Sequence, residues 1–182
     1  MFQAETRTGL LVASPQMRDP FFERTVVLLC QHDQDGAIGL VINRSGPITL
    51  ATVVEQLNEN ATPVNDQPTW WGGPVGPGTG FVIWRGRIKP DEGWNLGEEL
   101  AVSPSEEHLN RLIREGSNFN LCLGYAGWGP GQLENEIETG SWIYVDLDED
   151  LLFETPLEER YDKALGFLGA AAGSIWMQPI DE

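Results

Sequence analysis

The sequence has few of the residues that build metal centres, disulfide frameworks and nucleic-acid interfaces. Two cysteines and two histidines occur among 182 residues, and 11 basic residues stand against 28 acidic ones, which gives a net charge of -17. Cys30 and Cys122 lie in apolar runs, where a cysteine usually behaves as a small buried hydrophobe, so no secreted disulfide framework is predicted. The negative charge repels phosphate backbones and anionic membrane surfaces. We therefore expect no direct nucleic-acid binding and no membrane docking.

Long apolar segments are also lacking. No run approaches the ~20 residues of a membrane span. The apolar run at residues 10–13 is too short for the hydrophobic region of a signal peptide, and Glu5 precedes it. The default compartment is the cytoplasm. A chain of 182 residues is long enough for one core that buries roughly 70% of the unfolded surface, so we expect a single domain over residues 1–182.

Hydrophobic periodicity predicts an α+β protein in which strands and helices are interspersed. The predicted strands are residues 9–13, 25–30, 37–42, 69–71, 80–84, 96–102, 118–123 and 142–145. The predicted helices are residues 49–57, residues 103–116 with Ser103, Pro104 and Glu106 as the start signal, residues 132–139, and a last helix that starts at Thr155, Pro156 and Glu158. Two glycine-rich stretches, residues 72–80 and 124–131, are expected to be loops.

Three sequence blocks resemble the AlgH/YqgE family of bacterial proteins. They are residues 9–44, with Ser14-Pro15 and Asp19-Pro20-Phe21-Phe22, then Gly72-Gly73-Pro74-Val75, and the stretch from Gly124-Tyr125-Ala126-Gly127-Trp128-Gly129-Pro130-Gly131 to Gln132-Leu133-Glu134. Their order and spacing match across most of the chain. The resemblance implies a strongly coiled, partly bifurcated β-sheet with helices packed around it.

The same resemblance carries a functional expectation of limited detail. The family name comes from an association with the regulation of alginate production, and some members are labelled transcriptional regulators. It brings no catalytic set, ligand or cofactor to this sequence. Tyr161 departs from the family pattern, because a tryptophan commonly follows the arginine of the last helix there.

Cys30-x-His32, followed by Asp33 and Asp35, is the one local pattern that suggests a metal. Zinc sites usually need three or four ligands in spaced pairs, which this pattern does not supply, so no metal site is predicted. A Cys30/His32 nucleophile pair is disfavoured, since side chains two apart on a strand start about 7 Å apart and a buried thiol is inert.

Arg85, Arg87 and Lys89 form the compact basic cluster of the sequence. On a strand, their spacing of two places the three side chains on one face. A solvated strand face is the favoured interpretation, and a phosphate contact is the alternative.

The two glycine-rich stretches supply the candidate site. Neither has the lysine of a phosphate-binding loop or the glycine spacing of a dinucleotide fold. Tight turns that let Trp128 pack are the favoured interpretation of residues 124–131, and residues 72–80 carry the same ambiguity. If the two stretches meet in space, they could form one cleft with Trp71 and Trp128 as walls, which suits a small organic ligand. The candidate ligand or partner-binding residues are Asn43, Arg44, Gly73, Pro74, Gly127, Trp128, Gly129 and Gln132.

Two functional hypotheses follow. The favoured one is a non-catalytic cytoplasmic binding or regulatory protein whose partner is another protein or a small molecule. The alternative is an enzyme or small-molecule-binding protein that uses the cleft between the two glycine-rich stretches. No cofactor is predicted. A concave pocket with a titratable residue of shifted pKa favours the alternative, whereas a closed surface with an exposed apolar patch favours the first.

Overall fold

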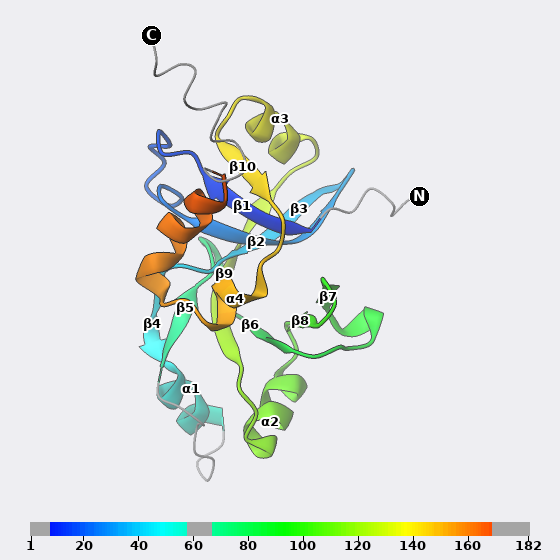
Figure 1. The fold of residues 1–182 in the computed structure, drawn as a ribbon. Coiled ribbons are helices and arrows are strands. Elements are labelled where there is room, and N and C mark those ends of the chain that lie inside the picture. The colour runs from blue at the N-terminus through cyan, green and yellow to red at the C-terminus, as the bar shows by residue number, and fades with distance from the viewer. Residues whose placement is uncertain (1–7, 58–66, 169–182) are drawn as a thin grey trace.

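The computed structural model describes residues 8–57 and 67–168, and these residues form a mixed α+β fold (Figure 1). The strands are β1 (Gly9–Ala13), β2 (Val26–Asp33), β3 (Gly36–Val41), β4 (Ser45–Thr49), β5 (Pro68–Trp71), β6 (Val75–Arg85), β7 (Trp94–Leu96), β8 (Leu100–Ser103), β9 (Asn120–Trp128) and β10 (Trp142–Val145). The helices are α1 (Leu50–Leu57), α2 (Glu106–Glu115), α3 (Gln132–Glu138) and α4 (Glu149–Phe153), with short turns η2 (Pro90–Glu92) and η3 (Leu157–Glu159) and a helix over residues 160–168.

The sheet divides at β9. Its main path is β10-β1-β2-β3-β9-β6-β8-β7, while β5 pairs with β9 on a second branch that also carries β4. The C-terminal part of β9 pairs with β3, and its earlier residues Cys122 and Leu123 pair with β5. In Figure 1, β1, β2, β3 and β10 therefore occupy the upper half, and β4 to β8 occupy the lower half. The expected bifurcated α+β sheet is confirmed.

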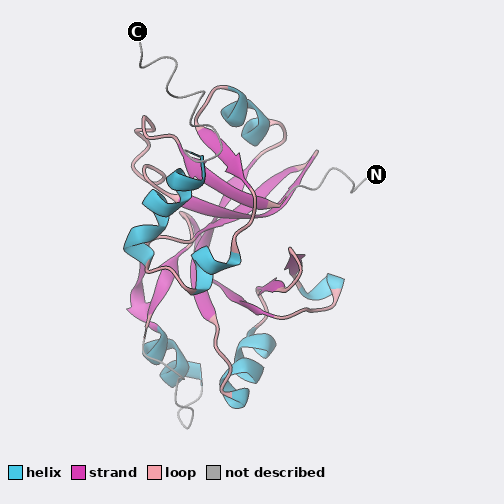
Figure 2. Ribbon diagram, in the orientation of Figure 1, coloured by secondary structure: helices cyan, strands magenta, loops and turns pink. Residues whose placement is uncertain are grey.

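Two hydrophobic cores correspond to these two halves. The larger contains β1 and β2, whose residues are almost all buried because apolar side chains cover both faces of these strands. The smaller packs α1 and α2 against β6 and β8 through residues such as Val54, Leu109 and Val82. The helices lie around the sheet (Figure 2). None of the described helices is both long and apolar enough to cross a bilayer.

Several predicted elements match closely, and others need correction. β1 and β10 have the predicted bounds, and Gly116 ends α2 in a left-handed conformation. The cap of α2 is Ser105 and not Ser103, whose hydroxyl instead donates to the Glu92 carbonyl. The predicted strand 96–102 is a tight pair, β7 and β8. Residues 58–68, whose polar composition predicts a loop, lie largely outside the described residues.

The last part of the chain contains a helix that periodicity did not predict. α4 begins at the Asp148 cap and ends before Thr155, whose hydroxyl donates back to the Asp150 carbonyl instead of capping the following helix. Tyr161, the departure from the family pattern, is buried and its hydroxyl donates to the Ala13 carbonyl at 2.7 Å. Tyrosine therefore fastens this segment to β1 with a hydrogen bond.

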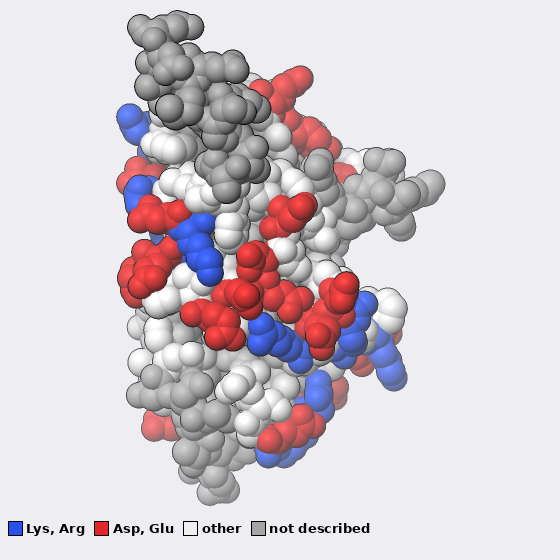
Figure 3. Space-filling model, viewed as in Figure 1, with Lys and Arg blue, Asp and Glu red and all other residues white. Residues whose placement is uncertain are grey.

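Acidic side chains gather across the middle of one face, with a few basic side chains between them (Figure 3). The basic cluster predicted on one strand does not form as such, because β6 ends at Arg85. The Arg87 guanidinium lies beyond that end and donates to the carbonyls of Gly97 and Glu98.

Candidate functional site

The two glycine-rich stretches lie side by side, and each is partly strand: only residues 72–74 and 129–131 are outside strands, as expected of loops. Residues 75–80 belong to β6 and residues 124–128 to β9, and Val75 pairs with Tyr125. A Cβ atom on Gly73 would lie 2.2 Å from the carbonyl carbon and oxygen of Tyr125. The two backbones are therefore in direct contact, and no ligand-sized space separates them at this point.

Pro74 and Gly127 occupy the surface on either side of this contact. Pro74 is half-buried just before β6, and Gly127 is exposed in β9, where it pairs with Ile38 of β3. Neither has a side chain that donates or accepts a hydrogen bond. Their placement is consistent with strand architecture.

Asn43 and Arg44 hold the turn over residues 19–24. The Arg44 guanidinium donates to the carbonyls of Phe21 and Glu23 at 2.6 and 2.7 Å. The Asn43 amide donates to the carbonyl of Arg24 at 2.8 Å, and Arg24 has a φ of 56°, a left-handed conformation uncommon for residues other than glycine. These two polar side chains therefore stabilise a strained turn.

That turn connects the two glycine-rich stretches through consecutive aromatic residues. Phe21 stacks on Trp71 with ring centroids 6.3 Å apart, and Phe22 stacks on Trp128 at 6.4 Å. Phe21 remains 52% exposed, which makes it an unusually open aromatic side chain. The predicted site residues therefore lie around one aromatic turn, and the walls expected of a cleft are occupied by the protein's own rings.

Trp128, Gly129 and Gln132 belong to one hydrogen-bond network centred on Glu136. The indole nitrogens of Trp128 and Trp142 each donate to Glu136 Oε1 at 3.0 Å, and Gln132 Nε2 donates to Oε2 at 2.9 Å. The Gly129 N–H donates to Gln132 Oε1 at 3.0 Å. The network joins the end of β9, α3 and β10, so these residues have a clear architectural role.

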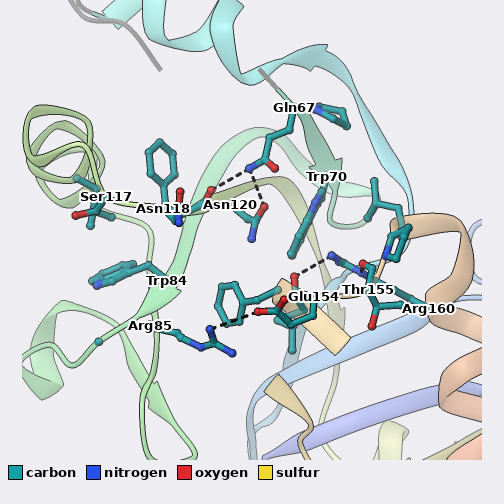
Figure 4. Close-up of a pocket in the computed structure, with 18 of the residues that line it drawn as sticks. Gln67, Trp70, Trp84, Arg85, Ser117, Asn118, Asn120, Glu154, Thr155 and Arg160 are labelled. Carbon is teal, nitrogen blue, oxygen red and sulfur yellow. Dashed lines mark hydrogen bonds and ion pairs between the residues drawn. The ribbon is translucent and has the colours of Figure 1, made fainter. Parts of the chain in front are cut away.

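A groove of about 1180 Å³ opens elsewhere, between the start of β9, the end of β6, α2 and the α4–η3 segment (Figure 4). The residues that define it best are Trp70, Trp84, Arg85, Asn120, Glu154 and Arg160. None of the eight predicted site residues lines this groove.

The groove lies at the boundary between the two hydrophobic cores. Trp70 and Leu152 belong to the larger core, whereas Trp84, Leu112 and Phe119 belong to the smaller one. The two cores leave a space between them here, because β6 and the chain before β9 diverge. Binding sites occur preferentially at such boundaries, where two rigid parts meet.

Arg160 is the buried charge of the groove. Its guanidinium donates to the carbonyls of Thr155, Ile42 and Leu152, and it lies 4.5 Å from the centre of the Trp70 ring. Burial lowers the pKa of Arg160 to about 10, so it stays protonated at neutral pH. No carboxylate among the described residues lies within 4 Å of it. Buried charges are normally paired, and this one relies on carbonyl dipoles and an aromatic ring.

Arg85 connects β6 to the α4 segment across the groove. Its guanidinium nitrogens lie 3.6, 3.6 and 3.8 Å from carboxylate oxygens of Glu149, Asp150 and Glu154, and its centre lies 4.6 Å from the Phe153 ring centre. These distances exceed those of hydrogen bonds, so the ion pairs are loose. Because Arg85 and its carboxylate partners all contact solvent, each of the three ion pairs contributes little to stability.

Amide groups form part of the groove floor. Gln67 Nε2 donates to the Phe119 carbonyl at 3.1 Å and to Asn120 Oδ1 at 3.0 Å. The Asn120 amide nitrogen then points into the hollow (Figure 4). The floor thus offers a hydrogen-bond donor between aromatic side chains, a combination typical of binding sites.

The charged residues of the groove lining are four arginines and three glutamates. Its residues include no histidine, cysteine, lysine or aspartate. The two histidines face carboxylates away from its floor, with His32 Nε2 3.3 Å from Glu134 and His108 Nε2 3.2 Å from Glu92. Within the described residues, no three His, Cys, Asp or Glu side chains are grouped to hold a metal ion.

Sequence patterns gave little indication of the groove. Arg160 carried one signal, because a charged side chain adjoins Tyr161 in the buried stripe of the last helix. Arg85 and Arg87 carried another as part of the basic cluster, for which a solvated strand face was the favoured interpretation. Trp70, Trp84 and Asn120 lie 50 or fewer residues apart in sequence but come from three different strands, so their proximity depends on the sheet topology.

Comparison with known proteins identifies the family. The model of the AlgH-like family matches residues 10–172. The chain belongs to this family. A UPF0301 protein of Vibrio cholerae is 37% identical over 173 residues, covering 91% of this chain and 92% of its own. A UPF0301 protein of Anaeromyxobacter dehalogenans is 42% identical over 171 residues, covering 88% and 87%.

Solved structures support the same assignment. The solution structure of the AlgH protein from Pseudomonas aeruginosa is similar with a TM-score of 0.74 and 38% identity, over 89% of this chain and 88% of that one. Protein DIP2367 from Corynebacterium diphtheriae has a TM-score of 0.68 at 22% identity, over 87% and 86% of the two chains, which is a likeness of fold. The AlgH-like assignment names a fold and no specific function.

Proposed function

We propose that this AlgH-like protein acts by binding a partner, without catalysing a reaction, and that the groove is where it binds. The observation that carries the proposal is the position of the groove at the boundary of the two cores, with the buried guanidinium of Arg160 in its lining. A buried cation that has no carboxylate partner among the described residues is stabilised further when an occupant supplies acceptors.

The lining supports binding over catalysis. Acid–base and nucleophilic catalysis need a poised side chain such as histidine, cysteine, lysine or a carboxylate close to the reacting atoms. The groove offers glutamates as its carboxylates, and two of the three, Glu115 and Glu154, lie within 4 Å of the Arg111 and Arg85 guanidinium groups, as ion-pair partners. Its other polar groups are arginine and amide side chains, beside aromatic rings. These groups recognise a partner through hydrogen bonds, charge and stacking.

The cellular setting is part of the same proposal. We place the protein in the cytoplasm as a regulatory binding protein, with a protein or small molecule as partner and no direct contact with nucleic acid. Two buried free thiols fit a reducing compartment. The net charge of -17 supports partners other than nucleic acid.

Affinity capture with a groove-filled bait tests the proposal. Asn118 is exposed and lines the groove, so Asn118→Trp should occupy part of it without disturbing either core. Asn135→Trp makes the same change at an exposed position of α3, outside the groove. We expect the parent and Asn135→Trp to capture the same partner from the native cell and Asn118→Trp to lose it. Equal capture by all three baits would place the binding surface elsewhere.

A further inference from the structure

The central strand β6 has a free edge where the groove opens. On one side β6 pairs with β8 as far as Arg85, opposite Leu100. On the other side, within the described residues, it pairs with β9 only as far as Ile83, opposite Asn120. Residues 84–87 and 116–119 then diverge and both line the groove. The groove therefore occupies the place of a missing strand pairing.

Backbone groups of Arg85 point into that vacant place. The Gly86 N–H donates to the Glu99 carbonyl, on the β8 side. Backbone groups alternate in direction along an antiparallel strand, so the N–H and carbonyl of Arg85 point the opposite way, toward the groove. Toward the groove, the pairing of β6 with β9 ends at Ile83, and no turn or loop hydrogen bond between described residues uses either group. An unpaired N–H and carbonyl in this arrangement are a template for an added strand.

The charges around this edge favour an acidic residue in the added strand. Four arginines and three glutamates line the groove, in a protein whose net charge is -17. Two of the arginines, Arg87 and Arg160, have no carboxylate within 4 Å among the described residues. Both donate their hydrogen bonds to backbone carbonyls, and Arg160 also lies over the Trp70 ring, so a carboxylate could pair with either without displacing another carboxylate.

The size of the groove favours a peptide over a compact small molecule. Its volume of about 1180 Å³ exceeds the roughly 300–1000 Å³ of typical small-molecule sites. Residues 84–87 correspond to about 13 Å of extended chain at about 3.3 Å per residue. That length suits a segment of four to five residues.

We propose that the groove receives an extended, singly acidic segment of a partner polypeptide, which adds as a strand to the free edge of β6 at Arg85 and directs its carboxylate to the exposed Arg87. This inference rests on the proposed function and names the class of partner and the binding mode. Strand addition draws its affinity from main-chain hydrogen bonds and its specificity from alternate side chains.

An arrayed library of random octapeptides, probed with the purified protein, tests the inference. We expect bound peptides to be enriched in β-branched residues and to contain one aspartate or glutamate. Each bound peptide is then resynthesised with an N-methyl group at one amide at a time. Methylation at alternate positions should weaken binding about ten-fold or more, because it removes main-chain donors from one edge of the peptide.

A pair of substitutions at one position tests the protein side. Arg85→Pro removes the free N–H without breaking the pairing with β8, whereas Arg85→Ala removes the same side chain and keeps the N–H. We expect Arg85→Pro to bind the selected peptides at least about ten-fold more weakly than Arg85→Ala does. Arg87→Gln should weaken binding of the acidic peptides and leave their amide-for-acid analogues unaffected. If Arg85→Pro does not fold, N-methylation of peptides against the parent protein decides alone.

The outcomes separate the two proposals. Absence of any bound peptide, or binding that is indifferent to N-methylation and equal for Arg85→Pro and Arg85→Ala, overturns strand addition. In that case loss of capture by Asn118→Trp would still support the groove as a binding site for another class of ligand. A partner that displaces Phe21 from its stack on Trp71, and whose capture is unaffected by Asn118→Trp, would overturn both the groove as binding site and strand addition.

Discussion

Gly73 lies directly against the carbonyl of Tyr125, and this contact joins the two glycine-rich stretches. Gly73 has a φ of 152°, and a Cβ atom at this position would lie 2.2 Å from both the carbon and the oxygen of that carbonyl. The glycine is therefore required by close backbone approach between β9 and the chain that leads into β6. The stretch works as architecture that brings the two halves of the sheet together.

Substitution of Gly73 should be far more harmful than substitution of a neighbouring glycine. Gly73→Ala forces the two backbones apart and should lower the free energy of unfolding by about 3 kcal/mol or more. Gly78→Ala is the matched control, because nothing lies within 4 Å of its added Cβ atom. The free energy of unfolding of Gly78→Ala should lie within about 0.5 kcal/mol of the parent value or slightly above it. Urea denaturation of both variants checks this, and equal stabilities would contradict the contact.

Glu136 should behave as a structural residue. Its loss leaves the indole nitrogens of the buried Trp128 and Trp142 without their acceptor. We expect Glu136→Ala to lower the free energy of unfolding by about 2–4 kcal/mol, with partner capture by the folded protein unchanged. Glu138→Ala, at an exposed position of the same helix, should change it by no more than about 0.5 kcal/mol. If folded Glu136→Ala loses partner capture, the network around Glu136 takes part in binding.

The two buried thiols predict a specific dependence of stability on alkaline pH. Burial raises the pKa of Cys30 and Cys122 well above the ordinary value of 9.0. Their contribution to stability is fully present below pH 9 and is lost as the pH rises toward the raised values, because the unfolded thiols ionise first. Each thiol should contribute a fall of about 1.4 kcal/mol per pH unit at most.

The measurement is the free energy of unfolding between pH 9 and 10, below the ordinary tyrosine pKa of 10.0. The parent should lose stability in this window, and the variant with Cys30→Ala and Cys122→Ala should lose less per pH unit. Both thiols should also resist labelling in the native protein at neutral pH. Rapid labelling, or parallel pH profiles, would show that the thiols are not buried.

Direct DNA binding should be absent at physiological salt. The net charge of -17 opposes it, and α1 and α2 are separated by five intervening elements, so they do not form a helix-turn-helix pair. Titration of duplex DNA with the purified protein should give no salt-sensitive complex with a dissociation constant below about 1 μM. Any regulatory role would then pass through a protein or small-molecule partner.

The sequence predicted the family, the fold class and most elements, because these depend on local patterns. β1, β10 and α3 were found from apolar periodicity, and the motif around Trp128 carried the family resemblance. The glycine-rich stretches were taken for loops because glycine is common in turns. Here glycine serves close approach between β9 and the chain that leads into β6, as Gly124 and Gly73 show, and this depends on the neighbouring backbone.

The groove was not predictable in the same way. Its residues come from β5, β6, β9 and the segment after α4, and the vacant strand position exists only because β9 begins at Asn120 while β6 continues to Arg85. Register of this kind is set by three-dimensional packing. A missing neighbour leaves no local pattern, and Arg85 was therefore assigned to a solvated strand face.

Hydrogen exchange of the protein alone and with its captured partner shows whether the free edge of β6 at Arg85 is where the partner binds. We expect the Arg85 amide to exchange faster than the Gly86 amide in the free protein, because Gly86 donates to Glu99 and Arg85 has no acceptor among the described residues. Partner binding should then protect Arg85 and residues 117–120, and leave residues 19–24 and 127–132 unchanged. Protection centred on residues 19–24 with no change at Arg85 would contradict the account and place function on the aromatic turn around Phe21.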